Sequence, residues 1–230
     1  MNNLVVKLVN ISKTYPPNVV ALSNIDLEIR KGEFVSVVGK SGAGKTTLAK
    51  LLIGEEKPSS GKMEVLNWQV ANFSKRDLSY YRRQIGVIFQ DFKLLERKTV
   101  YENVAFALMV CETPNKNIRK TVPQILSMVG LSGKEKRFPD ELSGGEQQRL
   151  AIARSLVHHP KLLIADELTG NLDALYAWEI VEILLRVNEL GTSVVLFTHD
   201  RDIVNRLKRR VVTLEEGKII RDQKTGGYMI

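Results

Sequence analysis

The chain has 230 residues, 43% of them hydrophobic, and a formal net charge of +8 at pH 7. It is long enough to bury a large core as one domain, and its single cysteine, Cys111, excludes a disulfide framework and indicates a reducing compartment. The longest apolar run, Val104–Cys111, is far shorter than the roughly 18 residues of a membrane-spanning helix, and the N-terminus has no secretory signal pattern.

Basic residues are dispersed along the chain, and aromatic residues do not alternate with them as in a platform for single-stranded nucleic acid. We therefore expect a cytoplasmic protein whose positive charge attracts it mildly to a membrane surface. Nucleic-acid binding is the alternative, and we do not expect it. Cys111 follows an apolar run and is expected to be a buried, unreactive thiol.

The first part of the chain predicts strands. Leu4–Ile11 is expected to be a strand, and Ser12–Val19, which contains a Pro-Pro pair, a loop. Ile25–Arg30 alternates strictly between apolar and polar residues, which indicates a half-exposed strand. A short turn then leads to Phe34–Val38, an apolar and β-branched segment typical of a buried strand.

The next segment, Gly39–Thr46, fits the pattern G-x-x-x-x-G-K-[ST] of a phosphate-binding loop and precedes a helical pattern over Thr47–Ile53. Its glycines allow successive backbone N–H groups to surround an anion, and the helix dipole adds positive potential. Lys45 would reach the β- and γ-phosphates and Thr46 would hold Mg2+; the alternative is an ordinary Gly/Ser turn. The residues predicted to bind nucleotide here are Gly39, Lys40, Ser41, Gly42, Ala43, Gly44, Lys45, Thr46 and Thr47.

The middle of the chain changes from strands to helices. A strand over Met63–Leu66, a basic helix over Leu78–Gln84 and a buried strand over Ile85–Phe89 are expected first. From Asp91 to about Asp140 the pattern is helical, with helices over Val100–Val110 and Ile118–Val129.

The last part returns to alternating strands and helices. Its predicted elements are a strand at Leu162–Ala165, a helix at Ala174–Leu190, a strand at Ser193–Phe197, a helix from Asp200 and a hairpin over Arg210–Ile220. The fold class is α/β: a mostly parallel sheet, an antiparallel β element at the N-terminal side and a helical subdomain. We expect one domain over residues 1–230, with a core of about 1–90 and 155–230 and a helical subdomain of about 91–154.

Polar side chains follow the predicted strands at the edge where open α/β sheets bind ligands. Asp166 is expected to order Mg2+ or its water shell, and Glu167 to act as general base on the attacking water; a solvated acidic turn is the alternative. His199 could hydrogen-bond the γ-phosphate, and Gln90 could lie near Mg2+ or water. Purely structural roles for these two remain open.

A second Ser/Gly-rich helix start follows at Ser143, which suits a helix N-cap. The chain has one phosphate loop, so a dimer in which this segment closes on the partner's nucleotide is an economical arrangement. The residues expected to act there are Ser143, Gly144, Gly145 and Glu146.

Together, these motifs resemble those of the ATP-binding cassette (ABC) ATPases, which belong to the P-loop NTPases. The matching segments are Gly39–Thr46, Gln90, Leu142–Gln147, Leu162–Glu167, Asn171–Asp173 and His199. The resemblance implies a head-to-tail homodimer with two ATP molecules at its interface, crossed by Asn171–Asp173. It also implies that Tyr15 stacks on adenine, that Gln90 lies in a loop linking nucleotide to a membrane partner, and that His199 is the switch histidine.

Within that family, Arg82–Leu95, Thr99–Leu108 and the tail Ile220–Tyr228 resemble the bacterial cell-division ATPases that pair with an FtsX-like integral membrane protein. This implies a peripheral protein on the cytoplasmic face of the inner membrane that regulates cell-wall hydrolases. Thr169–Asp173 is shared with ATPases of lipoprotein-releasing and macrolide exporters, which remain an alternative. The partner could contact the apolar stretch around Phe92, Leu94, Leu95 and Val100–Phe106, with core packing as the alternative.

Two residues depart from the family pattern. Leu168 stands where a proline usually follows the catalytic glutamate, and we expect it to loosen the turn beside Glu167. It is the one hint for a third possibility, a nucleotide-gated structural tether with little turnover. Lys40 stands where a proline is common and is expected to matter less.

Overall fold

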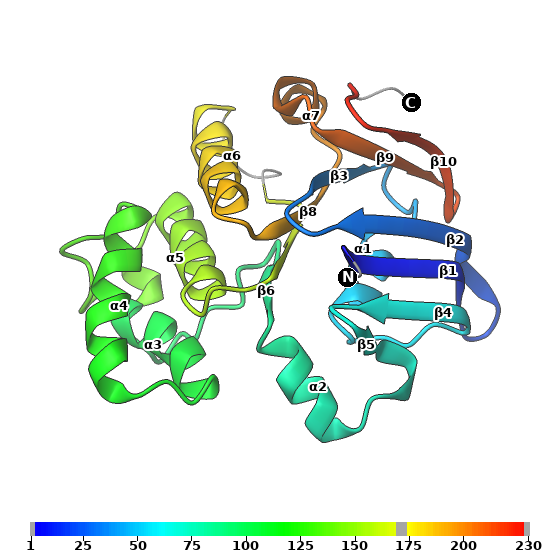
Figure 1. Ribbon diagram of the computed structural model, residues 1–230. Coiled ribbons are helices and arrows are strands. Elements are labelled where there is room, and N and C mark those ends of the chain that lie inside the picture. Colours follow the sequence, from blue (N-terminus) through cyan, green and yellow to red (C-terminus); the bar gives the residue numbers. More distant parts are fainter. Residues whose placement is uncertain (1–2, 169–173, 228–230) are drawn as a thin grey trace.

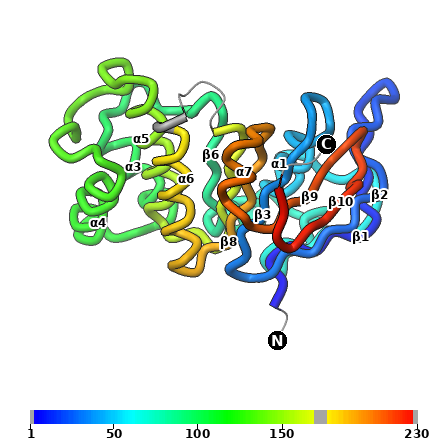
Figure 2. The backbone as a smooth tube through the Cα atoms, turned by 90° about the horizontal axis from the view of Figure 1, so that it is seen from above, coloured from blue at the N-terminus to red at the C-terminus, as the bar shows by residue number. Residues whose placement is uncertain are grey.

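The computed structural model describes residues 3–168 and 174–227, together with the side chains of this part except those of 174–176. It contains two sheets and a group of helices at one side (Figure 1). Turned by 90°, the chain shows α3, α4 and α5 at one end and the strands β1, β2 and β10 at the other (Figure 2). Among the described helices, each is too short or too polar to cross a lipid bilayer.

The larger sheet has the strand order β10-β9-β3-β8-β7-β6, and all neighbours except β9 and β10 run parallel. This confirms the predicted mostly parallel sheet and the C-terminal hairpin. Its strands are β3 (Phe34–Val38), β6 (Ile85–Ile88), β7 (Leu162–Asp166), β8 (Ser193–Thr198), β9 (Arg210–Glu215) and β10 (Lys218–Gln223).

The smaller sheet is antiparallel, with the order β2-β1-β4-β5, and forms the predicted N-terminal element. Its strands are β1 (Leu4–Tyr15), β2 (Val19–Arg30), β4 (Ser60–Val65) and β5 (Trp68–Gln69). The expected loop over Ser12–Val19 was wrong, because β1 continues to Tyr15, which pairs with Val19 of β2. Only the prolines and Asn18 form the turn.

The helices follow their sequence signals closely, and three of them begin with a capping box, at Ser74, Thr99 and Ser143. The helix over Val100–Val110 has the predicted bounds. The helices are α1 (Lys45–Leu52), α2 (Lys75–Arg82), α3 (Val100–Val110), α4 (Asn115–Met128), α5 (Gly144–Leu156), α6 (Ala174–Glu189) and α7 (Arg201–Leu207), with short 3-10 turns η1 (Val70–Asn72) and η2 (Pro139–Glu141).

The parallel strands β3, β7 and β8 bury both faces, as a run of apolar residues predicts. Val35 and Val37 of β3 join α1 and the smaller sheet in one core cluster. Phe34 of the same strand joins the helices in the other cluster, because successive side chains of a strand point to opposite faces. Helix α1 is thus held between the two sheets.

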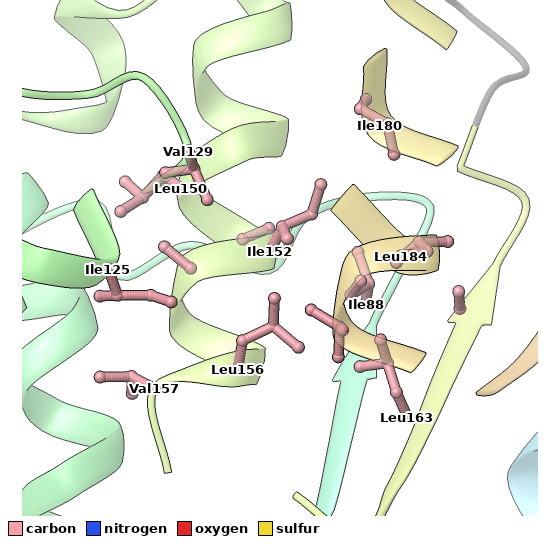
Figure 3. Packing of buried hydrophobic residues seen from close by; sticks show 14 of the residues in the cluster. Ile88, Ile125, Val129, Leu150, Ile152, Leu156, Val157, Leu163, Ile180 and Leu184 are labelled. Carbon is pink, nitrogen blue, oxygen red and sulfur yellow. The ribbon is translucent and has the colours of Figure 1, made fainter. Parts of the chain in front are cut away.

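Helix α5 lies between the helical group and the larger sheet (Figure 3). Ile152 and Leu156 lie on the side of the strand residues Ile88 and Leu163, whereas Leu150 lies on the side of α4 (Figure 3). All of these side chains are buried. The predicted division into a core and a helical subdomain stays a prediction. Helices α3, α4 and α5 share one core cluster with the larger sheet.

Candidate functional site

The phosphate-loop segment lies between the end of β3 and the start of α1, as predicted. Gly42 and Gly44 adopt φ values of 81° and 103°, a region that favours glycine. A Cβ atom on Gly44 would also lie 2.7 Å from the carbonyl oxygen of Ala21. Gly39 has an ordinary φ, but a Cβ there would collide with the carbonyl of Leu214. The loop therefore needs glycine at these positions for different reasons.

A turn of the larger sheet forms a hydrogen bond to this loop, and the smaller sheet forms a hydrogen bond to that turn. The N–H of Gly217, in the turn between β9 and β10, donates to the Ala43 carbonyl at 3.2 Å. The Gly217 carbonyl in turn accepts from the N–H of Ser23 in β2 at 2.8 Å. The backbone that would surround a phosphate is fixed by its protein surroundings.

A cavity of about 680 Å³ opens on this loop. It contains most of the predicted loop residues together with Gln90, Glu167 and His199, so the structure brings these distant segments to one place. Its lining residues are Val19, Val20, Ala21, Lys40, Ser41, Gly42, Gly44, Lys45, Thr46, Thr47, Gln90, Glu167, His199 and Arg201.

Sequence reasoning missed part of this lining. Val19 and Val20 are 58% and 60% exposed, unusual for valine at the start of a strand, and they offer the cavity an apolar wall. Tyr15, predicted to stack on adenine, does not line the cavity but pairs with Val19 at its edge. Arg201, two residues after His199, also lines the cavity. The sequence pattern gave no separate reason to select it.

Lys45 is 6% exposed and is bound by its own loop. Its ammonium donates to the carbonyls of Gly39 at 2.8 Å and Lys40 at 3.2 Å. It also lies 3.4 Å from Oε1 of Glu167. The cation thus lines the cavity, with acceptors that a phosphate oxygen could replace.

Glu167 connects Lys45 to His199. Its Oε2 lies 2.6 Å from Nδ1 of His199, and its backbone N–H donates to the Phe197 carbonyl at 2.9 Å. β7 ends at Asp166, and Glu167 has a φ of 50°, which is uncommon for a residue other than glycine. A left-handed residue therefore turns the chain directly after the strand, and the two adjacent carboxylates line different cavities.

Asp166 lies in a neighbouring cavity of about 460 Å³, which Thr46 and Gln90 also line. Burial, and then the charge of Glu167, raise the pKa of Asp166 to about 6. Its Oδ1 is buried and has no hydrogen-bond partner among the residues that the structure describes. A carboxylate, a hydroxyl and an amide that line one cavity are a donor set that fits Mg2+, which prefers oxygen ligands. The three predicted metal ligands thus share one cavity.

The Ser143–Glu146 segment forms the first turn of α5, with Ser143 as the predicted N-cap. The N–H of Ser143 donates to the Glu146 carboxylate at 2.9 Å, and Lys134 forms an ion pair with the same carboxylate. Lys134 and the backbone together lower the pKa of Glu146 to about 2. Among the residues that line the phosphate-loop cavity, none comes from this segment.

The structure bears on two further expectations. The Leu168 side chain is buried and its carbonyl accepts a hydrogen bond from Gln148, and a loosened turn beside Glu167 stays a prediction. In the apolar stretch proposed as a partner surface, Val100 and Val104 are fully buried and Phe106 is 47% exposed, so its contact with a partner stays a prediction. The predicted interface segment Asn171–Asp173 lies outside the described residues, as does Tyr228.

Comparisons with known proteins agree with this geometry. Residues 22–170 match the ABC transporter family. The chain is 48% identical over 223 residues to the cell division ATP-binding protein FtsE of Bacillus subtilis, covering 97% of this chain and 98% of that protein. FtsE of Mycobacterium tuberculosis is 46% identical over 226 residues, with 98% of each chain covered.

The chain is also similar to ATP-binding proteins with other names. The methionine import ATP-binding protein MetN of Helicobacter hepaticus is 42% identical, over 94% of this chain and 62% of that protein. A solved structure described as the dimeric post-hydrolysis state of the ATP-binding cassette MJ0796 with ADP and Pi superposes with a TM-score of 0.88 at 35% identity. It covers 97% of this chain and all of that one.

Proposed function

This chain belongs to the ABC transporter family and is an ATP-binding ATPase, and from that premise we propose that it drives an FtsX-like membrane protein during bacterial cell division. The single observation that carries the catalytic part is the chain of contacts from Lys45 through Glu167 to His199 at the phosphate loop. The relatives named FtsE, similar over nearly their whole length, carry the cellular part.

The phosphate loop binds the nucleotide through backbone N–H groups and the N-terminus of α1. Lys45 then exchanges its contacts with Gly39 and Lys40 for phosphate oxygens, which offer it a full negative charge. This exchange also releases Glu167 from Lys45. The exposed Val19 and Val20 offer apolar contact to the base beside Tyr15, for which stacking on adenine stays a prediction.

Asp166, Thr46 and Gln90 would hold Mg2+. The metal would neutralise charge that develops on the transferred phosphoryl group. Glu167 acts as general base on the attacking water, and His199 keeps its carboxylate in place through Nδ1. Positioning and charge stabilisation carry most of such a reaction.

Each chain supplies an incomplete site, because Ser143, Gly144, Gly145 and Glu146 do not line its own cavity. We therefore propose an ATP-dependent, head-to-tail homodimer in which this segment completes the partner's site. The dimeric cassette MJ0796 is a solved precedent for two such chains together. Docking to the membrane protein would hold the dimer at the cytoplasmic face of the bacterial inner membrane.

Steady-state phosphate release from the purified chain, with and without its co-expressed FtsX-like protein, tests this function. We expect Mg2+-dependent hydrolysis that changes when the membrane protein is present, and co-purification of the two. Release at the level of a buffer blank in both conditions would favour the structural tether. Stimulation by an exporter-type membrane subunit instead would favour the lipoprotein-release or macrolide-type alternative.

A further inference from the structure

Another cavity, of about 260 Å³, lies at the edge of the larger sheet opposite the phosphate loop. It opens among the turns that lead into the parallel strands β3, β7 and β8, which contribute Lys31, Lys161 and Thr192 to its lining. We call this cavity the turn pocket. Among the described residues, it shares none with the phosphate-loop cavity, and Ser143–Glu146 lines neither. A molecule bound there would leave both the nucleotide site and the proposed dimer segment free.

The walls of the turn pocket are largely aliphatic. Ile125 of α4, Leu156 of α5 and Val187 of α6 line it and are nearly buried. Figure 3 shows Ile125 pointing from α4 toward α5, which ends at Leu156. Two further lining residues, Met128 and Leu190, are 50% and 81% exposed. Because methionine adapts its shape readily, these two side chains can close over an apolar group that enters the pocket.

Hydrogen bonds hold the turns around the pocket in place. The side-chain amide of Asn188 donates to the carbonyls of Gly32 and Thr192, each at 2.9 Å. The Thr192 hydroxyl donates to the Pro160 carbonyl at 3.0 Å. These contacts join the turns before β3, β7 and β8 to one another. A pocket that is already formed loses little conformational freedom when it is filled, which favours binding.

The volume of the turn pocket indicates what kind of group it accepts. Sites for drug-sized ligands have roughly 300–1,000 Å³, and the turn pocket is smaller than this range. A single bulky side chain, such as leucine, phenylalanine or methionine, suits it better than a whole cofactor. An aliphatic or aromatic side chain anchored in a pocket is a usual centre of a protein-binding surface.

The charge around the pocket indicates what should flank that side chain. Lys31 and Lys161 line the pocket, and none of its described lining residues is acidic. The Lys161 ammonium donates to the neutral Gln84 amide oxygen at 2.8 Å, so its charge is not neutralised there. A second copy of this chain, with a net charge of +8, would be repelled. We propose that the turn pocket binds one apolar side chain from an acidic segment of a partner protein.

Selection of peptides from a random library displayed on phage, against the immobilised full chain, tests this proposal. We expect enrichment of peptides in which one leucine, phenylalanine or methionine is flanked by Asp and Glu. The most enriched peptide is then labelled with fluorescein and titrated with the parent and variants. Leu190→Glu should weaken binding about tenfold or more, because it replaces an apolar wall with a charge of the peptide's sign. Lys31→Glu should weaken it about two- to tenfold, and added salt should weaken binding to the parent.

Two variants outside the pocket serve as matched controls. Ile220→Glu changes an exposed aliphatic residue of β10, and Lys62→Glu an exposed lysine of β4. Both should bind the peptide as the parent does. All four variants should release phosphate from ATP at the parent rate, because none changes the phosphate-loop cavity. The peptide titration therefore tests the turn pocket separately from the proposed ATPase function.

Three outcomes would overturn the proposal. The first is enrichment of peptides that lack acidic residues, and the second is equal binding of the enriched peptide by the parent and Leu190→Glu. The third is no enrichment at all. In that case, binding of decanoate by the parent but not by Leu190→Glu would assign the pocket to a small amphipathic anion instead.

Discussion

The Glu167 carboxylate contacts Nδ1 of His199 at 2.6 Å although the two residues are 32 positions apart in the chain. They meet because β7 and β8 are parallel neighbours whose carboxyl ends lie together. Glu167 is mostly buried, with 14% of its side chain exposed, while His199 is 61% exposed. With Oε2 beside His199 and Oε1 3.4 Å from Lys45, the carboxylate is held in place at the cavity that it lines, as a general base requires.

The first prediction concerns this base. Glu167→Gln keeps the shape of the side chain but cannot accept a proton, so hydrolysis should fall by about 10² to 10⁴. ATP binding should remain, and an ATP-bound dimer should accumulate in size-exclusion chromatography. Glu179→Gln, on the exposed face of α6, is the matched control and should behave as the parent. Hydrolysis at the parent rate by Glu167→Gln would contradict the assignment.

The second prediction concerns the buried cation of the phosphate loop. Lys45→Met retains most of the volume but removes the charge, which contributes about 1.5–3 kcal/mol per charged hydrogen bond to a phosphate. ATP affinity measured by calorimetry should therefore fall about 10- to 100-fold. Lys62→Met, at an exposed position of β4, provides the control. An equal loss of affinity in both variants would mean that Lys45 acts only through general surface charge.

The third prediction is a pH dependence. Because burial raises the pKa of Asp166 to about 6, the folded state binds a proton between pH 4 and 6 that the unfolded state releases, and stability falls as pH rises through 6. Asp166→Asn should raise the melting temperature of the nucleotide-free protein at pH 7.5 (roughly neutral) but hardly at about pH 4. Exposed Asp140→Asn should show no such difference.

The same group predicts how metal use responds to acid. Mg2+ needs the ionised carboxylate, so protons compete with it below about pH 6. The Mg2+ concentration for half-maximal hydrolysis should rise about tenfold for each pH unit below that point. A requirement independent of pH from about 5 to 8 would remove Asp166 from the metal site.

The fourth prediction separates two reasons for glycine in the phosphate loop. Gly42→Ala introduces only backbone strain, since nothing lies within 4 Å of the new Cβ, and should cost about 1–2 kcal/mol. Gly39→Ala has an acceptable φ but collides with the Leu214 carbonyl, and overpacking of this kind costs about 1–3 kcal/mol or more. Urea unfolding should therefore rank Gly39→Ala as the less stable variant. The reverse order would mean that Leu214 moves freely.

Regular elements were predictable because their patterns are local. Phe34–Val38 and Val100–Val110 have the predicted bounds, the former from its run of β-branched residues and the latter from its capping box and apolar spacing. The hairpin around the Pro-Pro pair was missed because the polar residues near Tyr15 look like a loop when read alone. These residues form a strand because they pair with β2, and the local sequence does not show that pairing.

The motifs of the site could be predicted from the sequence, but the contacts that hold their residues in place could not. Parallel strands ending in polar residues predicted that Gln90, Glu167 and His199 would meet, and all three line the cavity. The left-handed conformation of Glu167 has no signal in its residue type. Arg154, in the last turn of α5, donates to the carbonyls of Phe92 and Lys93 in the loop that follows Gln90. It escaped notice because these partners are backbone carbonyls about 60 positions away, which side-chain patterns do not record.

Helix α5 also imposes a constraint of helical phase. With about 100° of rotation per residue, Ser143 and Arg154 are separated by about three full turns and lie on nearly the same side of the helix. One inserted residue between them would rotate Arg154 by about 100° and shift it by about 1.5 Å, away from the Phe92 and Lys93 carbonyls. The length of this segment is therefore more restricted than its composition: many substitutions between the two ends keep their alignment, whereas any change in residue number loses it.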